Sequence, residues 1–271
     1  MENVKIIRDL LKRNVQYKIY NPGGNITALV DGTDFTINQR ELINKYILET
    51  NKEVEQVGFL SKTKKRLEMA GGELCLNATR CAIWEYLKGK EGIVSITVSG
   101  YSKKIIGTIS SNKTVEIKLD IGKELKDLVE IKYDFICVKL EGIIIAILNE
   151  EKSKKYICEL KKDEEHAKQQ IKQIMKQLDF KEKAIGVILL ENNNKQIKIN
   201  PIVWVKKIDT LYYETACGSG SLGTAIYNFI KNNQEKNKFM QPSGYVIAVD
   251  IIGNKKYINK AIIKGKVESF K

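Results

Sequence analysis

The sequence lacks the residues of several common kinds of functional site. It has a single histidine, His166, and its five cysteines form no Cys-x-x-Cys pair, which disfavours a Cys/His zinc site, so we expect no metal. No Gly-x-x-x-x-Gly-Lys phosphate-binding loop occurs. The longest apolar run, 142–148, has the length of a strand and is far shorter than the roughly 20 residues that cross a bilayer. The sequence therefore predicts neither metal chemistry nor a membrane span.

Charge is plentiful but dispersed. There are 46 Lys and Arg residues against 33 Asp and Glu, a formal net charge of +13, and no block of five or more basic residues. We expect no nucleic-acid partner, because such proteins gather their basic residues on one face. The segment 1–5 mixes both charges and has no apolar signal region, which indicates a cytoplasmic protein. We expect a small-molecule partner; the oligomeric state stays open, with a homodimer among the options.

Two segments, one in each half of the chain, share a pattern. The segment 71–81, with Cys75, and the segment 214–221, with Cys217, each read as a strand end, a cysteine-bearing turn and a helix that begins next to the sulfur. The flanking elements recur in the same order, which indicates an architecture built twice. The pattern predicts an α+β protein with domains 1–130 and 131–271, and one thiol from each domain faces a cleft between them.

Periodicity predicts the individual elements. In the first half we expect helices from a Thr36–Gln39 capping box and from Cys75, and strands at about 15–20, 26–30, 54–60, 65–70, 93–98, 103–109 and 114–120. In the second half we expect helices at 160–178 and from Cys217, and strands at about 131–140, 143–148, 184–190, 196–205, 245–251, 255–259 and 260–268. Residues 1–13 fit either a short helix or an edge strand.

A cysteine at a helix N-terminus lies beside free backbone N–H groups and the positive end of the helix dipole. We expect this position to lower the thiol pKa towards neutrality and to bind a carboxylate nearby. Two such turns facing each other would hold one carboxylate and place a sulfur on each side of the adjacent carbon. This arrangement suits inversion of a stereocentre, with one thiolate removing the α-proton and the opposite thiol donating another. No pyridoxal phosphate is needed, and we expect no cofactor.

Each of these residues also has a structural interpretation. A single cysteine near a helix start is more often structural than catalytic, and only the matched pair favours function. We interpret Cys81 as a packing residue, and Cys137 and Cys158 as ordinary semi-buried side chains. Asn25, after a Pro-Gly-Gly turn, could be a turn former, and His166 lies on a charged helix where it would be solvated.

At these residues the chain resembles the diaminopimelate epimerase family of cofactor-independent amino-acid racemases and epimerases. The resemblance covers nearly the whole length and is carried by Gly24-Asn25, Cys75-x-Asn77-Ala78, Ala216-Cys217-Gly218-Ser219-Gly220 and Ile263-Lys264-Gly265-Lys266-Val267. It implies two pseudo-symmetric domains, each with a sheet wrapped around a central helix, and an active site between them. The last strand often returns to the first domain in this family, which would place about 261–271 there.

The resemblance also implies roles for individual residues. Cys75 and Cys217 resemble the base and acid of the family, and Asn25 a contact to the polar α-groups of the substrate. The backbone donors to the α-carboxylate would come from Leu76, Asn77, Gly218 and Ser219.

The substrate is where the chain departs from diaminopimelate epimerases. Those enzymes carry a Glu-Arg pair upstream of the second cysteine, and the Arg helps to hold the distal carboxylate; here those places are Ile208 and Asp209. Their Gly-Asn-Pro-His segment is also missing. The distal-carboxylate reader is therefore absent, and we rank diaminopimelate second as a substrate.

A closer resemblance is to the histidine racemases of staphylopine-type metallophore pathways. It rests on Tyr20-Asn21-Pro22-x-Gly24-Asn25-x-Thr27, Glu55-Gln56-Val57-Gly58-Phe59, Glu73-x-Cys75-x-Asn77-Ala78-Thr79, Val98-Ser99-Gly100 and Cys217-Gly218-Ser219-Gly220. The resemblance implies that Glu55 lies near the substrate side chain, where it could accept a hydrogen bond from an imidazole N–H; as a bare residue it would be a solvated strand residue. We predict an isomerase that interconverts L- and D-histidine. A racemase for another amino acid, and a protein of this fold that only binds an amino acid or nucleic acid, are the alternatives.

Overall fold

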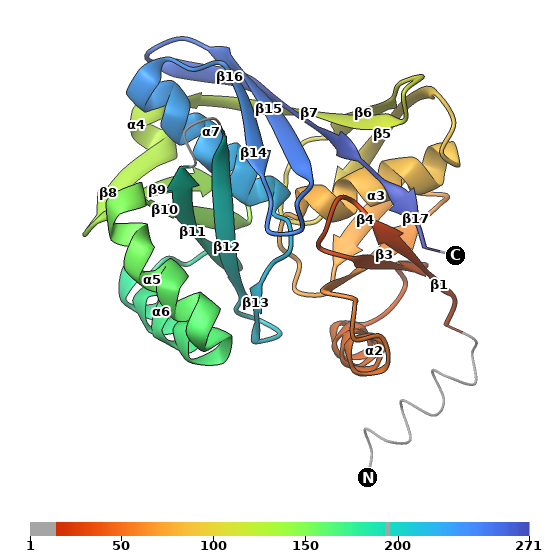
Figure 1. The fold of residues 1–271 in the computed structure, drawn as a ribbon. Helices are drawn as coiled ribbons and strands as arrows, with labels where there is room; N and C mark the ends of the chain where they lie inside the picture. The colour runs from red at the N-terminus through yellow and green to blue at the C-terminus, as the bar shows by residue number, and fades with distance from the viewer. Residues whose placement is uncertain (1–14, 193–195, 271) are drawn as a thin grey trace.

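Two helices, Leu76–Leu87 and Gly218–Asn232, are each surrounded by strands (Figure 1). The computed structural model describes residues 15–192 and 196–270. The prediction for residues 1–13 lies outside these residues. The first half contains β1 (Tyr17–Asn21), β2 (Thr27–Asp31), α2 (Ile37–Thr50), β3 (Gln56–Ser61), β4 (Arg66–Met69), α3 (Leu76–Leu87), β5 (Gly92–Val98), β6 (Ile105–Ile109) and β7 (Thr114–Glu124).

The second half is longer. It contains α4 (Leu125–Leu128), β8 (Val129–Lys132), β9 (Phe135–Leu140), β10 (Ile143–Leu148), α5 (Glu150–Lys162), α6 (Glu164–Leu178), β11 (Ala184–Asn192), β12 (Ile197–Val205), β13 (Thr210–Tyr213), α7 (Gly218–Asn232), β14 (Lys236–Met240), β15 (Val246–Gly253), β16 (Tyr257–Lys266) and β17 (Glu268–Ser269). The predicted capping box opens α2, since Thr36 and Gln39 exchange side-chain and backbone hydrogen bonds.

Four predicted elements of the second half are wrong. The strand at 131–140 is the hairpin β8–β9, because Tyr133 turns the chain with φ of +51°. The helix at 160–178 is two helices: Asp163 ends α5, and its carboxylate accepts the His166 N–H at 3.0 Å to begin α6. The strands at 255–259 and 260–268 are one strand, β16, with an irregularity between Ile258 and Lys260. Helix α4 and strands β13 and β14 were not predicted.

The strands pair in one continuous path through both halves. Strand β17 is followed by β1, β2, β3, β4, β5, β6 and β7; β7 then pairs with β16, and the path continues through β15, β14, β12, β11, β10, β9 and β8. Strand β7 and the late strand β16 are antiparallel from Glu124 opposite Tyr257 to Thr114 opposite Lys266. Figure 1 shows these strands running across the top of both halves. Division into domains at residue 130 stays a prediction.

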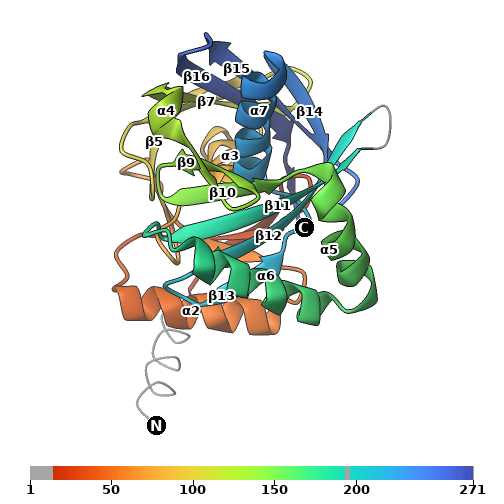
Figure 2. The ribbon, with the colours of Figure 1, turned by 90° about the vertical axis from the view of Figure 1, so that its left-hand side faces the viewer.

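The apolar run 142–148 forms β10, which is buried on both faces. Ile143, Ile145 and Ile147 belong to the large core cluster around α3 and α7, whereas Ile144, Ala146 and Leu148 pack with α5 and α6. Figure 2 shows α7 on one side of β10 and β11, and α5 and α6 on the other. A strand covered on both sides reads as an unbroken hydrophobic run. No helix of the described residues is long and apolar enough to cross a membrane.

The close approach of α7 to β10 depends on Gly223. A Cβ at this position would lie 2.5 Å from Cγ2 and 2.7 Å from Cβ of Ile145, which cannot move aside easily. We expect Gly223→Ala to lower the free energy of unfolding by about 1–2 kcal/mol despite the better helix propensity of alanine. Gly186→Ala is the matched control, because its Cβ would meet the mobile Cδ1 end of the same isoleucine at 3.2 Å. Denaturant unfolding should show the larger loss for Gly223→Ala; an equal loss would contradict the packing argument.

Candidate active site

Cys75 is the N-cap of α3, as the sequence predicts. Its sulfur accepts the Ala78 N–H at 3.4 Å and donates to Oε1 of Gln56 at 2.9 Å. The Thr79 hydroxyl donates to the Cys75 carbonyl at 2.7 Å, which secures the first turn of the helix. The thiol is therefore held between its own helix and a side chain from β3.

Cys217 is the N-cap of α7 in nearly the same geometry. Its sulfur accepts the Gly220 N–H at 3.2 Å, and the Ser221 hydroxyl donates to its carbonyl at 2.7 Å. A second glutamine, Gln241, supports this turn by accepting the Cys217 N–H at 2.9 Å. The two cysteines thus have matching caps, matching hydroxyl contacts and a glutamine each.

The N-termini of α3 and α7 touch each other. A Cβ on Gly218 would lie 2.9 Å from both Leu76 Cβ and Asn77 Oδ1, so only glycine permits this approach. The side-chain amide of Asn77 donates to the Ala216 carbonyl at 3.0 Å, which ties the first cysteine turn to the second. The two cysteine turns consequently form one rigid unit across the halves of the chain.

A single pocket opens at this contact, and all eight residues proposed from the sequence line it. They are Asn25, Glu55, Cys75, Leu76, Asn77, Cys217, Gly218 and Ser219. Leu76 is fully buried and Ser219 nearly so, which leaves their backbone groups as the parts able to meet a ligand. The sequence-based set is therefore brought together in space, with no member outside the pocket.

Asn25 enters the pocket from the turn between β1 and β2. The Asn21 side chain accepts the N–H groups of Gly23 and Gly24, at 3.0 and 2.6 Å, and so fixes the turn. Asn25 has a φ of +54° and donates its backbone N–H to the Thr215 hydroxyl at 2.6 Å. Its side-chain oxygen is buried and has no hydrogen-bond partner among the described residues. This oxygen is therefore a hydrogen-bond acceptor that a ligand in the pocket could use.

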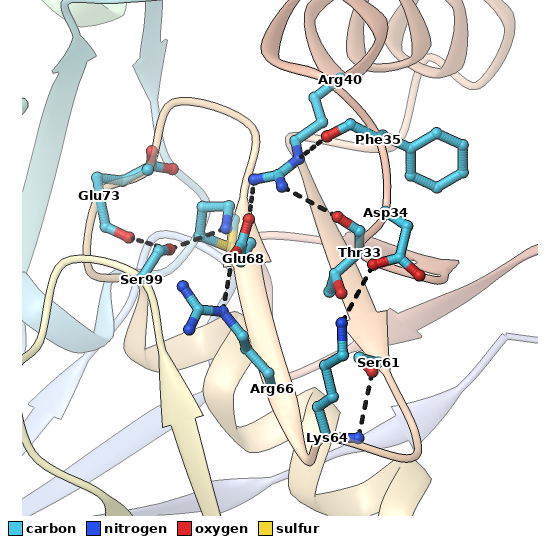
Figure 3. Close-up of polar contacts among 12 residues, drawn as sticks. Thr33, Asp34, Phe35, Arg40, Ser61, Lys64, Arg66, Glu68, Glu73 and Ser99 are labelled. Atoms are coloured by element: carbon cyan, nitrogen blue, oxygen red, sulfur yellow. Dashed lines mark hydrogen bonds and ion pairs between the residues drawn. The ribbon is translucent and has the colours of Figure 1, made fainter.

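Three glutamates surround the two thiols: Glu55, Glu73 and Glu214. Glu55 accepts the Thr215 N–H at 3.0 Å and also the Thr215 hydroxyl. The loop of Glu73 is fixed by Ser99, whose hydroxyl donates to the Glu73 carbonyl at 2.9 Å and accepts the Met69 N–H (Figure 3). One carboxylate oxygen of Glu73 and one of Glu214 are buried without a partner among the described residues.

Burial shifts the titration of all three glutamates in the same direction. Loss of solvation raises the pKa of Glu73 to about 7 and that of Glu214 to about 8, and it also raises the pKa of Glu55. The neighbouring charges of Glu55 and Glu73 raise the pKa of Glu214 further, whereas hydrogen bonds from Cys217 and Asn25 oppose the rise. The pocket thus holds more negative charge than it can solvate by itself.

The expected depression of the thiol pKa is wrong for the ligand-free pocket. Burial raises the pKa of both cysteines well above its usual value, and the Glu214 carboxylate raises it further. The N–H groups of Ala78 and Gly220 favour the thiolates, but this contribution is smaller than the cost of burial. Both cysteines are therefore thiols at neutral pH until something offsets the surrounding negative charge.

Sequence reasoning missed four residues of the site: Gln56, Glu73, Glu214 and Gln241. The first three stand next to residues that drew notice, Glu55 or a cysteine turn, so their position was a usable signal. Gln241 had no such signal, because it reaches Cys217 from the end of β14. Of the other cysteines, Cys81 and Cys137 are fully buried, whereas Cys158 is exposed rather than semi-buried. His166 is exposed, as predicted.

Known proteins are similar to this chain over nearly its whole length. Residues 14–270 match the family model described as the histidine racemase CntK N-terminal domain. The chain belongs to this histidine racemase family. A histidine racemase from Fusobacterium nucleatum is 30% identical over 261 residues, which cover 91% of this chain and 94% of the relative. The histidine racemase of Staphylococcus aureus is 23% identical, with 86% of this chain and 87% of the relative covered.

Solved structures share the fold of this chain. A probable proline racemase from Agrobacterium radiobacter has a TM-score of 0.60 at 12% identity, covering 94% of this chain and 91% of the other. A hydroxyproline epimerase from Agrobacterium vitis has a TM-score of 0.59 at 10% identity, covering 94% and 89%. A PhzC/PhzF-type protein from Clostridium difficile has a TM-score of 0.55 at 15% identity, covering 94% and 96%. The fold is mixed α+β, as predicted, with a large sheet, and its solved neighbours are of the proline racemase and PhzF type rather than specifically diaminopimelate epimerases.

The remainder of the pocket in this histidine racemase family member is formed by α2 and the segment around β13. Asn44 and Leu48 of α2 line it together with Ile208 and Tyr212. Helix α2 is anchored through Arg40, which pairs with Glu68 and donates to the carbonyls of Phe35 and Thr33 (Figure 3). No Lys or Arg is among the described residues that line the pocket.

The raised carboxyl pKa values predict how stability depends on pH. Both rise from an ordinary value of 4.5, so the fold favours the protonated forms, and this stabilisation is lost as pH rises through about 7 for Glu73 and about 8 for Glu214. As pH rises from 4.5 to these pKa values, each group lowers the free energy of unfolding by at most about 1.4 kcal/mol per pH unit. We expect Glu214→Gln, which cannot ionise, to gain melting temperature relative to the unaltered chain between pH 5 and pH 8. Exposed Glu53→Gln is the control, and a constant difference for Glu214→Gln would contradict the assignment.

Proposed function

We propose that this chain interconverts L- and D-histidine by proton transfer between Cα and the two thiols of Cys75 and Cys217. The observation that carries the proposal is the matched pair of cysteines at two touching helix N-termini in one pocket. Membership of the histidine racemase family supports the activity and the substrate. No cofactor is needed for this chemistry, because both proton carriers are side chains.

The ends of the two helices bind the substrate carboxylate. The first backbone N–H groups of a helix have no partner within it, and here they belong to Leu76 and Asn77 in α3 and to Gly218 and Ser219 in α7. Such groups, together with the positive ends of two helix dipoles, favour an anion. The α-ammonium group donates to the free oxygens of Asn25 and Glu214. The substrate is thus held by its α-groups, with Cα beside the sulfurs.

In the reaction one cysteine, as thiolate, removes the α-proton and its S–H bond forms as the Cα–H bond breaks. The electron pair left on Cα spreads into the carboxylate, where the helix ends stabilise it. The opposite thiol then donates its proton to the other face of Cα and becomes a thiolate. The ammonium charge beside Glu214 offsets the negative charge that opposes thiolate formation in the empty pocket. Each cysteine removes the α-proton of one enantiomer and, in the reverse direction, donates the proton that forms that enantiomer.

Glu55 reads the imidazole ring. A carboxylate offers about four lone-pair sites, and Thr215 occupies one on each Glu55 oxygen. The remaining sites can accept an imidazole N–H inside the pocket that Glu55 lines. The structural alternative is that Glu55 serves only to hold Thr215 through these two hydrogen bonds.

Diaminopimelate is the second candidate, and the pocket speaks against it. Its distal carboxylate would need a cation, yet none is among the described lining residues, and Ile208 lines the pocket instead. Asp209 cannot replace the missing cation, because it is acidic and its carboxylate already accepts from Trp204 at 2.7 Å and pairs with Lys172 at 2.6 Å. The two pseudo-symmetric domains typical of diaminopimelate epimerases, assembly as a homodimer and location in the cytoplasm stay part of the proposal.

Removal of either thiol should abolish racemisation. We expect Cys75→Ser and Cys217→Ser each to lower kcat for L-histidine by about 10²- to 10⁴-fold, the usual contribution of a general acid or base. A chiral assay in heavy water measures this, and each inverted product should carry one deuterium at Cα. Exposed Cys158→Ser is the control and should retain full activity. Full racemisation in both active-site variants would contradict the mechanism, and binding without any exchange of the α-proton would indicate a protein that only binds amino acids.

Loss of the Glu55 charge should weaken turnover of histidine selectively. Hydrogen bonds to charged groups contribute about 1.5–3 kcal/mol, so we expect Glu55→Gln to lower kcat/KM for histidine about 10- to 100-fold. The amide keeps an oxygen for Thr215, and Glu53→Gln provides a control two residues away. The unaltered enzyme should turn over L-histidine and not LL-diaminopimelate in the same assay. An equal loss for amino acids without a side-chain donor would show that Glu55 does not read the imidazole.

A further inference from the structure

Arg80 is a fully buried cation directly beneath the first cysteine turn. It is the fifth residue of α3, and side chains of a helix lean towards its N-terminus, so the guanidinium reaches back to the turn of Cys75. It donates to Asn77 Oδ1 at 2.7 Å, to the Pro22 carbonyl at 2.8 Å and to the Lys266 carbonyl at 3.2 Å. Asn77 in turn donates to Ala216, which precedes Cys217. One side chain thereby joins the Asn25 turn, both cysteine turns and the end of β16.

The charge of Arg80 has no acidic partner among the described residues. Its three acceptors are neutral, and its Nε–H has no partner within residues 15–192 and 196–270. Burial lowers the pKa of Arg80 to about 10, which still leaves it cationic at neutral pH. A buried charge without a counter-charge costs several kcal/mol, and a cation at a helix N-terminus adds to the positive end of the dipole. Neutral hydrogen bonding alone would not require a charged residue here.

The guanidinium is also held immobile. A Cβ at position 265 would lie 2.2 Å from Arg80 Nη1, so Gly265 gives way to the guanidinium and β16 closes over it. Two thiols belong to the same helix: Cys81 is the next residue after Arg80, and Cys75 caps the helix two residues before Asn77, which accepts from Arg80. Cys81 packs in the core, whereas Cys75 lines the pocket. The anion that this cation can meet during turnover is therefore the thiolate of Cys75.

We propose that Arg80 is a positioning residue whose fixed charge stabilises the Cys75 thiolate and whose hydrogen bonds hold the Asn25 turn and the Cys217 turn in register. The groups that face the Cys75 sulfur are Glu73 and Glu214, which oppose its ionisation, the neutral amide of Gln56, the Cys217 thiol, and Arg80 behind the turn. Arg80 is the one cation in this set. The inference rests on the proposed function in taking Cys75 to work as a thiolate.

The test measures the thiol itself rather than turnover. Rates of Cys75 alkylation by iodoacetamide are followed from pH 6 to pH 10 by peptide mass spectrometry in the full chain, in Arg80→Met and in Arg80→Lys. An opposite charge nearby commonly lowers a pKa by one unit or more, so at pH 8 we expect Cys75 in Arg80→Met to react at a rate lower by a factor of about ten or more than in the unaltered chain. Arg80→Lys keeps the charge and should stay near the unaltered rate, although it loses the forked hydrogen bonds and with them kcat more than KM. Arg66→Met, at a side chain half exposed beside Glu68, is the control.

The outcomes separate charge from structure. An unshifted Cys75 profile in Arg80→Met, with activity lost only in proportion to the unfolded fraction, would overturn the inference. If Arg80→Met does not fold, Cys75 alkylation at pH 8 that is about tenfold slower in folded Arg80→Lys than in the unaltered chain would overturn it, and a retained rate with reduced kcat would support it. A shifted profile in Arg80→Met with undiminished histidine racemisation would support the charge effect and refute the two-thiol mechanism.

Discussion

The contact between the N-termini of α3 and α7 is the constraint on which the site depends. Two helix ends of like partial charge repel each other, and here they lie close enough that only glycine fits at position 218. The bond from Asn77 to the Ala216 carbonyl holds them together in the empty protein. The substrate carboxylate that we propose to bind between the two ends would relieve this repulsion.

The negative side of the pocket completes this arrangement. One carboxylate oxygen each of Glu73 and Glu214 has no partner among the described residues, and burial raises the pKa of Glu55, Glu73 and Glu214 alike. A zwitterionic amino acid carries one charge for each side, an anion for the helix ends and a cation for the glutamates. Its binding lowers the free energy of both sides at once. Substrate binding also favours a thiolate, because the ammonium offsets the Glu214 charge that, in addition to burial, raises the pKa of both cysteines.

Local chemistry explains why so much of the site could be read from the sequence. The cysteine turns, the Asn25 turn and the capping box of α2 are each specified by residues within a few positions of one another, and all of them form. What failed depended on distant parts of the chain. The helix at 160–178 breaks because Asp163 caps one helix and begins another, and periodicity cannot show which role a residue takes. The thiol pKa moved upwards because burial by the whole fold exceeds a dipole effect that acts within one turn. Gln241 supports Cys217 from another strand, and no local pattern could announce it.

The matched cysteine turns suit a reaction that must run equally well in both directions. Enantiomers have equal free energy in water, so the ratio of kcat/KM for the two forms is fixed at one whatever the two thiols are like. The thiols nonetheless differ: Cys75 donates to the neutral Gln56, whereas Cys217 faces the Glu214 carboxylate. Because the ratio of kcat/KM for the two enantiomers is fixed, a difference between the two thiols changes kcat and KM by the same factor. Both constants are then larger for the enantiomer whose proton goes to the sulfur that ionises less readily, and smaller for the other enantiomer. The matched helix ends keep the difference in kcat and KM between the enantiomers small. The neutral partner Gln56 and the charged partner Glu214 decide which enantiomer has the larger values.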